Sequence, residues 1–162
     1  MVISRNPIKG LCMINVVLIS NDKTVQQRLA AQTDLQLTVL QASTVDETVR
    51  LAKQHSPDII ISEQKMENND IFCHFLSKTF PSAKNIILVE DFPTFTMLQN
   101  SGFKVRGYLT PEQKHLIVKA VRVVHDGEAW LPRKLVAEML DHYASIHSEL
   151  ANEQSVKLKV IS

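Results

Sequence analysis

The chain has 162 residues, of which 44% are hydrophobic and 22% are charged, as in ordinary globular proteins. This length accommodates one domain with a substantial core and one additional element at an end. The 18 Lys and Arg residues nearly balance the 17 Asp and Glu residues, and the net charge of +1 argues against a basic nucleic-acid-binding module. No apolar run reaches the roughly 18 residues of a membrane span. We therefore expect a cytoplasmic protein with no membrane partner.

Five short runs rich in Val, Ile and Leu have the length of β-strands. They cover residues 14–20, 35–41, 58–62, 85–90 and 105–110. The first, third and fourth runs are apolar at consecutive positions rather than at alternate ones. This pattern is typical of strands that are covered on both faces, and it therefore indicates a parallel sheet.

Segments with helical spacing follow these runs. In the first four segments, the residues predicted to face the core are Val25, Leu29, Val45, Val49, Ala52, Ile71, Phe72, Phe75, Leu76, Phe92, Phe95 and Leu98. The fifth helix has the clearest boundaries, because Thr110, Pro111 and Gln113 form a capping-box pattern at its start and Gly127 can end it in a left-handed conformation. The alternation predicts an α/β (βα)5 fold with a doubly wound parallel five-stranded sheet in the order 2-1-3-4-5.

An extra helix is expected after Gly127. Its apolar residues are spaced alternately by three and four, at Val136, Met139, Tyr143, Ile146 and Leu150. These residues form a heptad seam of about two heptads, which is too short for an autonomous coiled coil but can pair two protomers that also touch elsewhere. Alternatively, the helix folds back onto its own domain or is a linker to a downstream segment.

The pattern divides the chain into four parts. We expect an N-terminal extension at 1–12, the α/β domain at 13–128, the sixth helix or linker at 129–151 and a C-terminal tail at 152–162. The two terminal parts are predicted to be weakly ordered.

Three segments of the α/β domain resemble the receiver domain of NarL/FixJ-type response regulators. The sequence SPDIIISE at 56–63, followed by Met66, resembles the third strand and phosphorylation loop of that family. The sequence GYL at 107–109 resembles its fifth strand, and GEAWL at 127–131 resembles the exit from its last helix. The resemblance implies a flavodoxin-like fold. It also implies a phosphorelay in which an acidic pair helps to hold magnesium and an aspartate accepts the phosphoryl group.

The residues that this chemistry requires are replaced. In the alignment that the resemblance implies, the acidic pair falls on two neutral residues next to an aspartate, the acceptor on a glutamate, the switch hydroxyl on a valine and the lysine on a proline. These positions are Ser20, Asn21, Asp22, Glu63, Val89 and Pro111. Magnesium needs carboxylate oxygens at close range, and neither valine nor proline can donate a side-chain hydrogen bond to phosphate. We therefore predict a degenerate pocket without a catalytic residue, metal or cofactor.

Two other interpretations of this pocket stay open. Asp22 and Glu63 together provide two carboxylates, which form either a weak cation site or a solvated acidic rim. Glu63 is also longer than aspartate, so its charge can imitate a phosphorylated acceptor.

The segment that begins Trp130-Leu131-Pro132-Arg133 resembles the sixth-helix region of VpsT-type biofilm regulators. In that subgroup a W-x-[ST]-R motif binds cyclic di-GMP, and here Pro132 replaces the hydroxyl residue. The resemblance makes Trp130 and Arg133 candidate ligand-binding residues, because the planar guanidinium of an arginine suits base stacking and phosphate contact. A tryptophan followed by a proline that opens a helix is also a simple packing and capping arrangement.

Other kinds of chemistry find no motif in the sequence. The four glycines form neither a phosphate-binding loop nor a dinucleotide fingerprint, and none of the six histidines are spaced as i, i+4 pairs. Cys12 and Cys73 have no metal-ligand spacing and are expected to be reduced thiols. We therefore expect no enzyme activity.

These observations favour a phosphorylation-independent regulatory domain that homodimerises within a bacterial LuxR-type transcription regulator. The family resemblance implies that DNA is bound by a helix-turn-helix domain beyond Ser162. The alternatives are a domain that senses cyclic di-GMP and a stand-alone adaptor that binds another protein.

Overall fold

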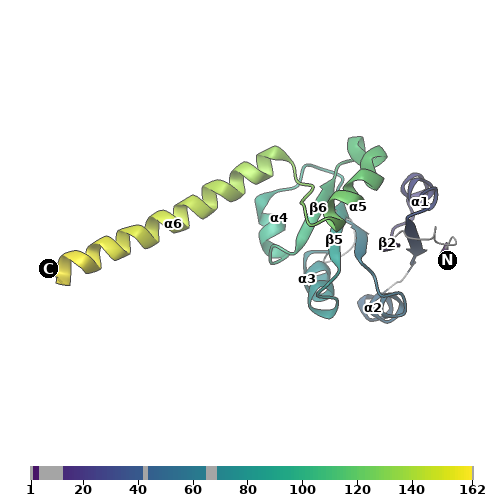
Figure 1. Cartoon of the computed structure of the whole chain (residues 1–162), viewed down its shortest axis with the longest axis horizontal. Coiled ribbons are helices and arrows are strands. Elements are labelled where there is room, and N and C mark those ends of the chain that lie inside the picture. Colours follow the sequence, from purple (N-terminus) through teal and green to yellow (C-terminus); the bar gives the residue numbers. More distant parts are fainter. Residues whose placement is uncertain (1, 4–12, 42–43, 65–68, 162) are drawn as a thin grey trace. The chain divides into compact units, whose positions relative to one another are not determined.

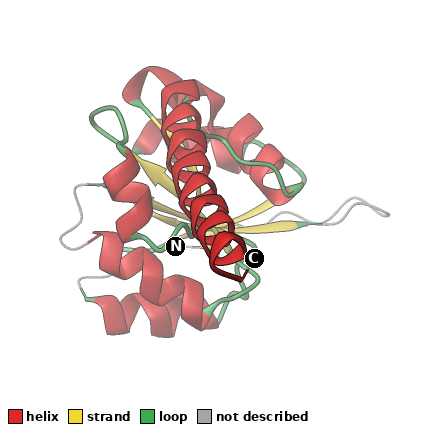
Figure 2. Cartoon of the chain, turned by 90° about the vertical axis from the view of Figure 1, so that its left-hand side faces the viewer, coloured by secondary structure: helices red, strands yellow, loops and turns green. Residues whose placement is uncertain are grey.

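The computed structural model describes residues 2–3, 13–41, 44–64 and 69–161. The chain divides into two compact units, Met1–Trp130 and Leu131–Ser162. The first unit consists of a β-sheet with helices around it, and the second contains one long helix, α6 (Arg133–Ile161) (Figures 1 and 2).

The sheet confirms the predicted strand order and adds one strand. Its strands are β1 (Val2–Ile3), β2 (Ile14–Ile19), β3 (Leu35–Val39), β4 (Ile59–Glu63), β5 (Lys84–Leu88) and β6 (Val105–Leu109). They lie in the order β1-β3-β2-β4-β5-β6, so the five parallel strands have the predicted order 2-1-3-4-5. The added strand β1 pairs antiparallel with β3 at one edge, within a segment that we predicted to be weakly ordered.

Helices cover both faces of the sheet, as a doubly wound fold requires. They are α1 (Lys23–Ala30), α2 (Val45–Lys53), α3 (Asn69–Thr79), α4 (Phe95–Asn100), the 3₁₀-helix η1 (Pro111–Leu116) and α5 (Ile117–His125). One cluster of buried side chains joins α1 and α5 to the sheet, and a second cluster joins α2 and α3 to it. The buried residues of the strands therefore contribute to two cores, which explains why their sequences are continuously apolar.

The start and end signals around the fifth predicted helix are confirmed. Thr110 and Gln113 form the capping box, and Gly127 has a positive φ of 97° after the helix ends. The structure divides the predicted helix, however, because its first six residues form η1 before α5 begins at Ile117.

Two phenylalanines predicted to face the core are exposed. Phe75 is 44% exposed on α3, and Phe92 is 58% exposed before α4. The hydroxyl oxygen of Thr94 accepts a hydrogen bond from the amide of Met97 at 3.2 Å, so the helix begins after Thr94 and Phe92 lies outside it. Other predictions cannot be compared because Cys12, Met66 and the side chains of Val45 and Ile71 lie outside the described residues.

The sixth helix is confirmed, but it is longer than predicted. It continues to Ile161, whereas the sequence pattern ended it at residue 151 and assigned a weakly ordered tail to 152–162. Across the residues that the structure describes, no helix is both long enough and apolar enough to pass through a bilayer.

Candidate functional site

The predicted pocket lies at the carboxyl ends of the parallel strands. Ser20 follows β2, Glu63 is the last residue of β4, Val89 follows β5 and Pro111 follows β6 by two residues. Because the carboxyl ends of neighbouring parallel strands meet at one edge of the sheet, the topology brings these four positions together.

Glu63, at the predicted phosphoryl-acceptor position, already has a hydrogen-bond partner within the chain. The hydroxyl of Ser20, which is 6% exposed, donates a hydrogen bond to Oε1 of Glu63 at 2.7 Å. The same hydroxyl oxygen accepts a hydrogen bond from the backbone amide of Asp22 at 3.0 Å. Ser20 therefore connects the ends of β2 and β4, at a position where the family has a metal-binding carboxylate.

Asp22 has a structural role with both of its carboxylate oxygens. Its Oδ1 caps α1 by accepting a hydrogen bond from the amide of Val25 at 3.1 Å, and its Oδ2 lies 2.6 Å from the ammonium of Lys114. Partial burial raises the pKa of Asp22, but the Lys114 ammonium and the Val25 amide outweigh that effect and hold this pKa below its ordinary value of 3.8. Asp22 is therefore ionised near neutral pH and already has a cationic partner.

The remaining predicted positions of the pocket offer little to a phosphoryl group. Val89 is 1% exposed, and its backbone amide donates to the carbonyl of Leu109 at 2.8 Å. Pro111 is exposed and begins η1, and Asn21 is exposed between β2 and α1. The switch and lysine positions thus contribute no side-chain donor.

Two residues outside the predicted set also make contacts at this edge of the sheet. Lys114 reaches Asp22 from one turn inside η1, across 92 positions of sequence. Gln64 follows β4, and its Oε1 accepts a hydrogen bond from the amide of Glu90 at 2.9 Å while its Nε2 lies 3.8 Å from the sulfur of Met97. The capping box at Thr110 predicted the turn that carries Lys114, but no local signal predicted the role of Gln64.

The residues present do not fit the magnesium ion that the family fold implies. Both oxygens of Asp22 are bound within the chain, and Oε1 of Glu63 accepts from Ser20. Within the described ranges, no group of three or more His, Cys, Asp or Glu side chains is arranged to hold a metal. A hard dication prefers several free oxygen ligands, and Lys114 already neutralises Asp22.

The two candidate ligand-binding residues belong to different units. Trp130 ends the first unit, where its amide donates to the carbonyl of Arg106 at 2.8 Å and its carbonyl accepts from the amide of Tyr108 at 3.0 Å. Its partly buried side chain packs against the core beside α5. These contacts account for Trp130 as a packing residue. Arg133 is exposed at the start of α6, and the binding of cyclic di-GMP stays an alternative interpretation.

The predicted seam on α6 is largely exposed. The exposed fractions are 39% for Val136, 71% for Tyr143, 43% for Ile146 and 53% for Leu150, whereas Met139 is partly buried. Leu140, which the sequence analysis did not include, adjoins the seam and is 63% exposed. The helix thus carries an apolar stripe that is open to a partner.

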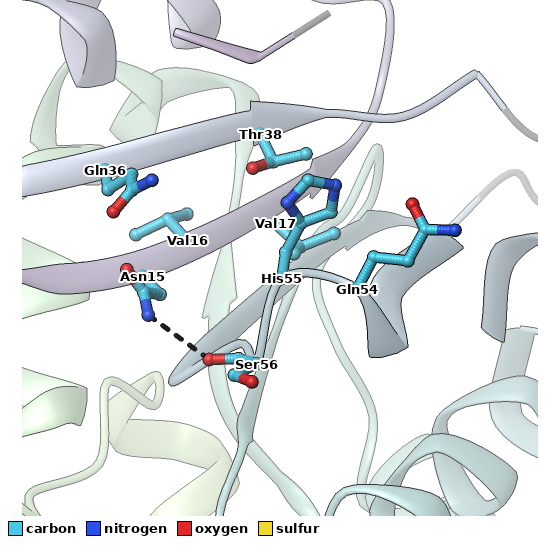
Figure 3. Close-up of a pocket in the computed structure, with 8 residues that line it drawn as sticks. All are labelled: Asn15, Val16, Val17, Gln36, Thr38, Gln54, His55 and Ser56. Carbon is cyan, nitrogen blue, oxygen red and sulfur yellow. Dashed lines mark hydrogen bonds between the residues drawn. The ribbon is translucent and has the colours of Figure 1, made fainter. Parts of the chain in front are cut away.

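A separate cavity of about 260 Å³ lies beside β2 and β3 (Figure 3). It is lined by polar residues that include Asn15, Gln36 and His55, and the side-chain amide of Asn15 donates to the carbonyl of Ser56 at 3.4 Å. No residue of the predicted phosphoacceptor pocket lines this cavity, and none of its lining residues is Asp, Glu, Lys or Arg. It therefore forms no part of the candidate site.

Sequence comparison relates the chain to bacterial regulatory proteins, although no protein-family model matches it. It is 28% identical over 137 residues to the transcriptional regulatory protein LnrK of Bacillus subtilis (strain 168), covering 81% of this chain and 62% of LnrK. It is 27% identical over 123 residues to the oxygen regulatory protein NreC of Staphylococcus haemolyticus, covering 70% of this chain and 54% of NreC. The chain therefore spans less than two thirds of the length of these relatives.

Solved structures share the fold at low sequence identity. A LuxR-family two-component response regulator from Aurantimonas sp. SI85-9A1 has a TM-score of 0.64 and 14% identity, covering 82% of this chain and 99% of that one. The isolated REC domain of RcsB from Salmonella enterica serovar Typhimurium, in its apo form, has a TM-score of 0.66 and 13% identity, covering 79% and 98%. The chain therefore has the fold of the receiver domains of LuxR-family response regulators, and in sequence it is similar to bacterial regulatory proteins.

Proposed function

We propose that this chain is a phosphorylation-independent regulatory domain that acts by homodimerisation within a LuxR-type transcription regulator. Independence from phosphorylation, the first part of this proposal, is supported by a continuous set of contacts in the pocket. Lys114 pairs with Asp22, the amide of Asp22 donates to Ser20, and Ser20 donates to Glu63. The chain's own side chains thus make the contacts that a metal and a phosphoryl group would otherwise make.

The chemistry of phosphoryl transfer supports the same conclusion. A phosphodonor would have to displace Ser20 from Glu63 and form a glutamyl phosphate, without magnesium to neutralise the charge that develops on the transferred group. Lys114 brings a cation to this edge of the sheet, but its ammonium is paired with Asp22. We therefore expect the phosphorylation step itself to be absent.

The second part of the proposal rests on α6. Its apolar stripe has the alternating spacing of a coiled-coil seam, and most of the stripe is exposed in a single chain. A seam of about two heptads gives only a weak dimer, so the protein concentration would control the fraction of paired chains.

The sequence relatives suggest which process such a dimer would regulate. LnrK is described as a transcriptional regulatory protein, and this chain covers 62% of its length. We propose that a DNA-binding domain follows this chain in the full protein and that α6 pairing brings two such domains onto two half-sites.

Intact-mass analysis after incubation with acetyl phosphate and magnesium tests the first part. We expect no phosphoryl adduct on the parent chain or on Glu63→Asp, because the metal, switch and lysine positions are altered as well. A receiver domain with an intact acidic pocket serves as the positive control. Labelling of either protein would contradict our account of the pocket.

Sedimentation equilibrium tests the second part. At roughly 50 µM, the range of weak interfaces, the parent chain should contain dimer. Tyr143→Glu combined with Ile146→Glu should raise the dissociation constant at least about tenfold, because two charges would be buried in the seam. The matched control is Ser145→Glu with Ser148→Glu, which adds the same charge to exposed positions off the seam and should leave dimerisation nearly unchanged. A parent chain that stays monomeric would refute this part.

A further inference from the structure

The heptad spacing of α6 assigns each residue a place relative to the seam. Val136, Tyr143 and Leu150 take the a positions, and Met139 and Ile146 take the d positions. The outward b, c and f positions between them are mostly polar or small; they are Ala137, Glu138, Asp141, Ala144, Ser145 and Ser148. Self-association through the stripe would therefore leave the charged c and f positions in water.

The same assignment places two histidines at the borders of the seam. His142 takes a g position and His147 takes the next e position, and both are exposed. The ring of His147 stacks on that of Tyr143, with centroids 6.4 Å apart and an interplanar angle of 12°. Because Tyr143 is a seam residue, this stacking keeps the imidazole of His147 beside the apolar stripe.

In a parallel pair of helices, a g position of one chain faces the next e position of the other. His142 then faces the partner's His147, and the two-fold symmetry repeats this contact on the opposite border. The next such contact joins Glu149 to the partner's Gln154, so the described g and e positions bring no two like charges together while the histidines are neutral. This charge pattern is compatible with a second copy of the chain as the occupant of the stripe.

We propose that the paired histidines make the α6 dimer sensitive to pH, an inference that rests on the proposed pairing of α6. Histidine side chains gain a proton as the pH falls through about 6.5. Protonation places two cations opposite each other on each border of the dimer, whereas in separate chains they are far apart. Protons therefore bind the separate chains better than the dimer, and the dimer weakens as the pH falls.

Other charged groups near these histidines do not reverse this effect. Glu138 lies one turn before His142 on the same helix, where it attracts a protonated His142 in the single chain and in the dimer alike. On the same helix, the residue one turn before His147 is Tyr143. Across the seam, His147 faces the partner's His142. Asp141 directly precedes His142 and takes an f position, and Glu149 follows His147 by two residues and takes a g position, on the opposite border of the seam from His147.

Sedimentation equilibrium of the full 162-residue chain at pH 7.5 and pH 5.5, at constant ionic strength, tests this proposal. We expect the dissociation constant to rise about fivefold at the lower pH, since like charges at neighbouring helix positions repel each other and two borders are affected. His142→Gln with His147→Gln should remove this dependence. His125→Gln, which changes an exposed histidine on α5, should keep it.

A second variant provides permanent charge at the same positions. His142→Lys with His147→Lys should weaken the dimer at pH 7.5 by a similar factor, without acid. If the Gln variant responds to pH as strongly as the parent chain, the histidine proposal is wrong while the α6 dimer stands. If the parent chain forms no dimer at either pH, the proposed function and this inference fail together.

Discussion

Replacing Lys114 by methionine tests whether the ion pair between Lys114 and Asp22 stabilises the folded chain. Methionine keeps most of the side chain's length but removes the ammonium that lies 2.6 Å from Oδ2 of Asp22. The side chains of Lys114 and Asp22 are 34% and 16% exposed, so solvent screens the pair only in part. After allowing for that screening, we expect a loss of about 1 kcal/mol in the free energy of unfolding.

The effect should depend on pH in a defined direction. The pKa of Asp22 is lowered in the folded chain, so the pair stabilises the fold fully above the ordinary value of 3.8 and this stabilisation is lost as the pH falls through the lower, folded pKa. Thermal unfolding at pH 7.0 should show a melting temperature about 2–4 °C lower for Lys114→Met than for the parent chain. At pH 3.0 the difference should be smaller.

Lys119→Met is the matched control, because Lys119 is an exposed lysine on α5. It should change the melting temperature by less than about 1 °C, as surface substitutions usually do. The reasoning would be refuted if Lys114→Met were no more destabilising than Lys119→Met at pH 7.0, or if its effect were equally large at pH 3.0.

Three further outcomes are expected. Glu63→Gln should leave the dimer dissociation constant within about twofold, because the amide oxygen can still accept the Ser20 hydrogen bond; a larger change would favour a phosphomimetic role for the charge. Isothermal titration calorimetry with cyclic di-GMP should give no binding heat, since Pro132 lacks a hydroxyl and Trp130 packs on the core, and a saturable heat would support the ligand-sensing alternative. Gly107→Ala should cost about 1 kcal/mol in urea unfolding, because overpacking a buried position is destabilising; its new Cβ would lie 3.2 Å from Cγ1 of Ile86 and 3.5 Å from Cβ of Trp130. An unchanged urea midpoint would contradict that packing argument.

The sequence predicted the parallel sheet because burial on both faces leaves a direct mark on each strand. The run from Ile14 to Ile19 is apolar at nearly every position, and β4 and β5 each contain three consecutive apolar residues. Strand β1 escaped prediction because two residues are too few to show any periodicity, and its pairing with β3 is a long-range contact. Phe92 was assigned to a buried face because its spacing to Phe95 suggested a helix, whereas the Thr94 cap starts α4 later.

At the candidate site, the sequence alone identifies the residues that differ from the family pattern, but not the contacts that these residues make. Comparing the chain with the family pattern was enough to find neutral or apolar residues at Ser20, Val89 and Pro111. The ion pair between Asp22 and Lys114 was not predictable in the same way, because it depends on how η1 is placed over the ends of the strands. Pairings between distant segments are set by tertiary packing, which local patterns do not encode.

Trp130 has a consequence for how copies of this chain can associate. Its two backbone hydrogen bonds, with Arg106 and Tyr108, cover part of the outer edge of β6, and β1 covers the edge of β3 on the opposite side. An uncovered strand edge is a template for strand addition and aggregation, whereas a strand as short as β1 is a poor one. Because one edge of the sheet is partly covered and the other ends in a very short strand, open-ended polymerisation by strand addition is disfavoured. Association through side-chain surfaces, which can form closed assemblies, is favoured instead.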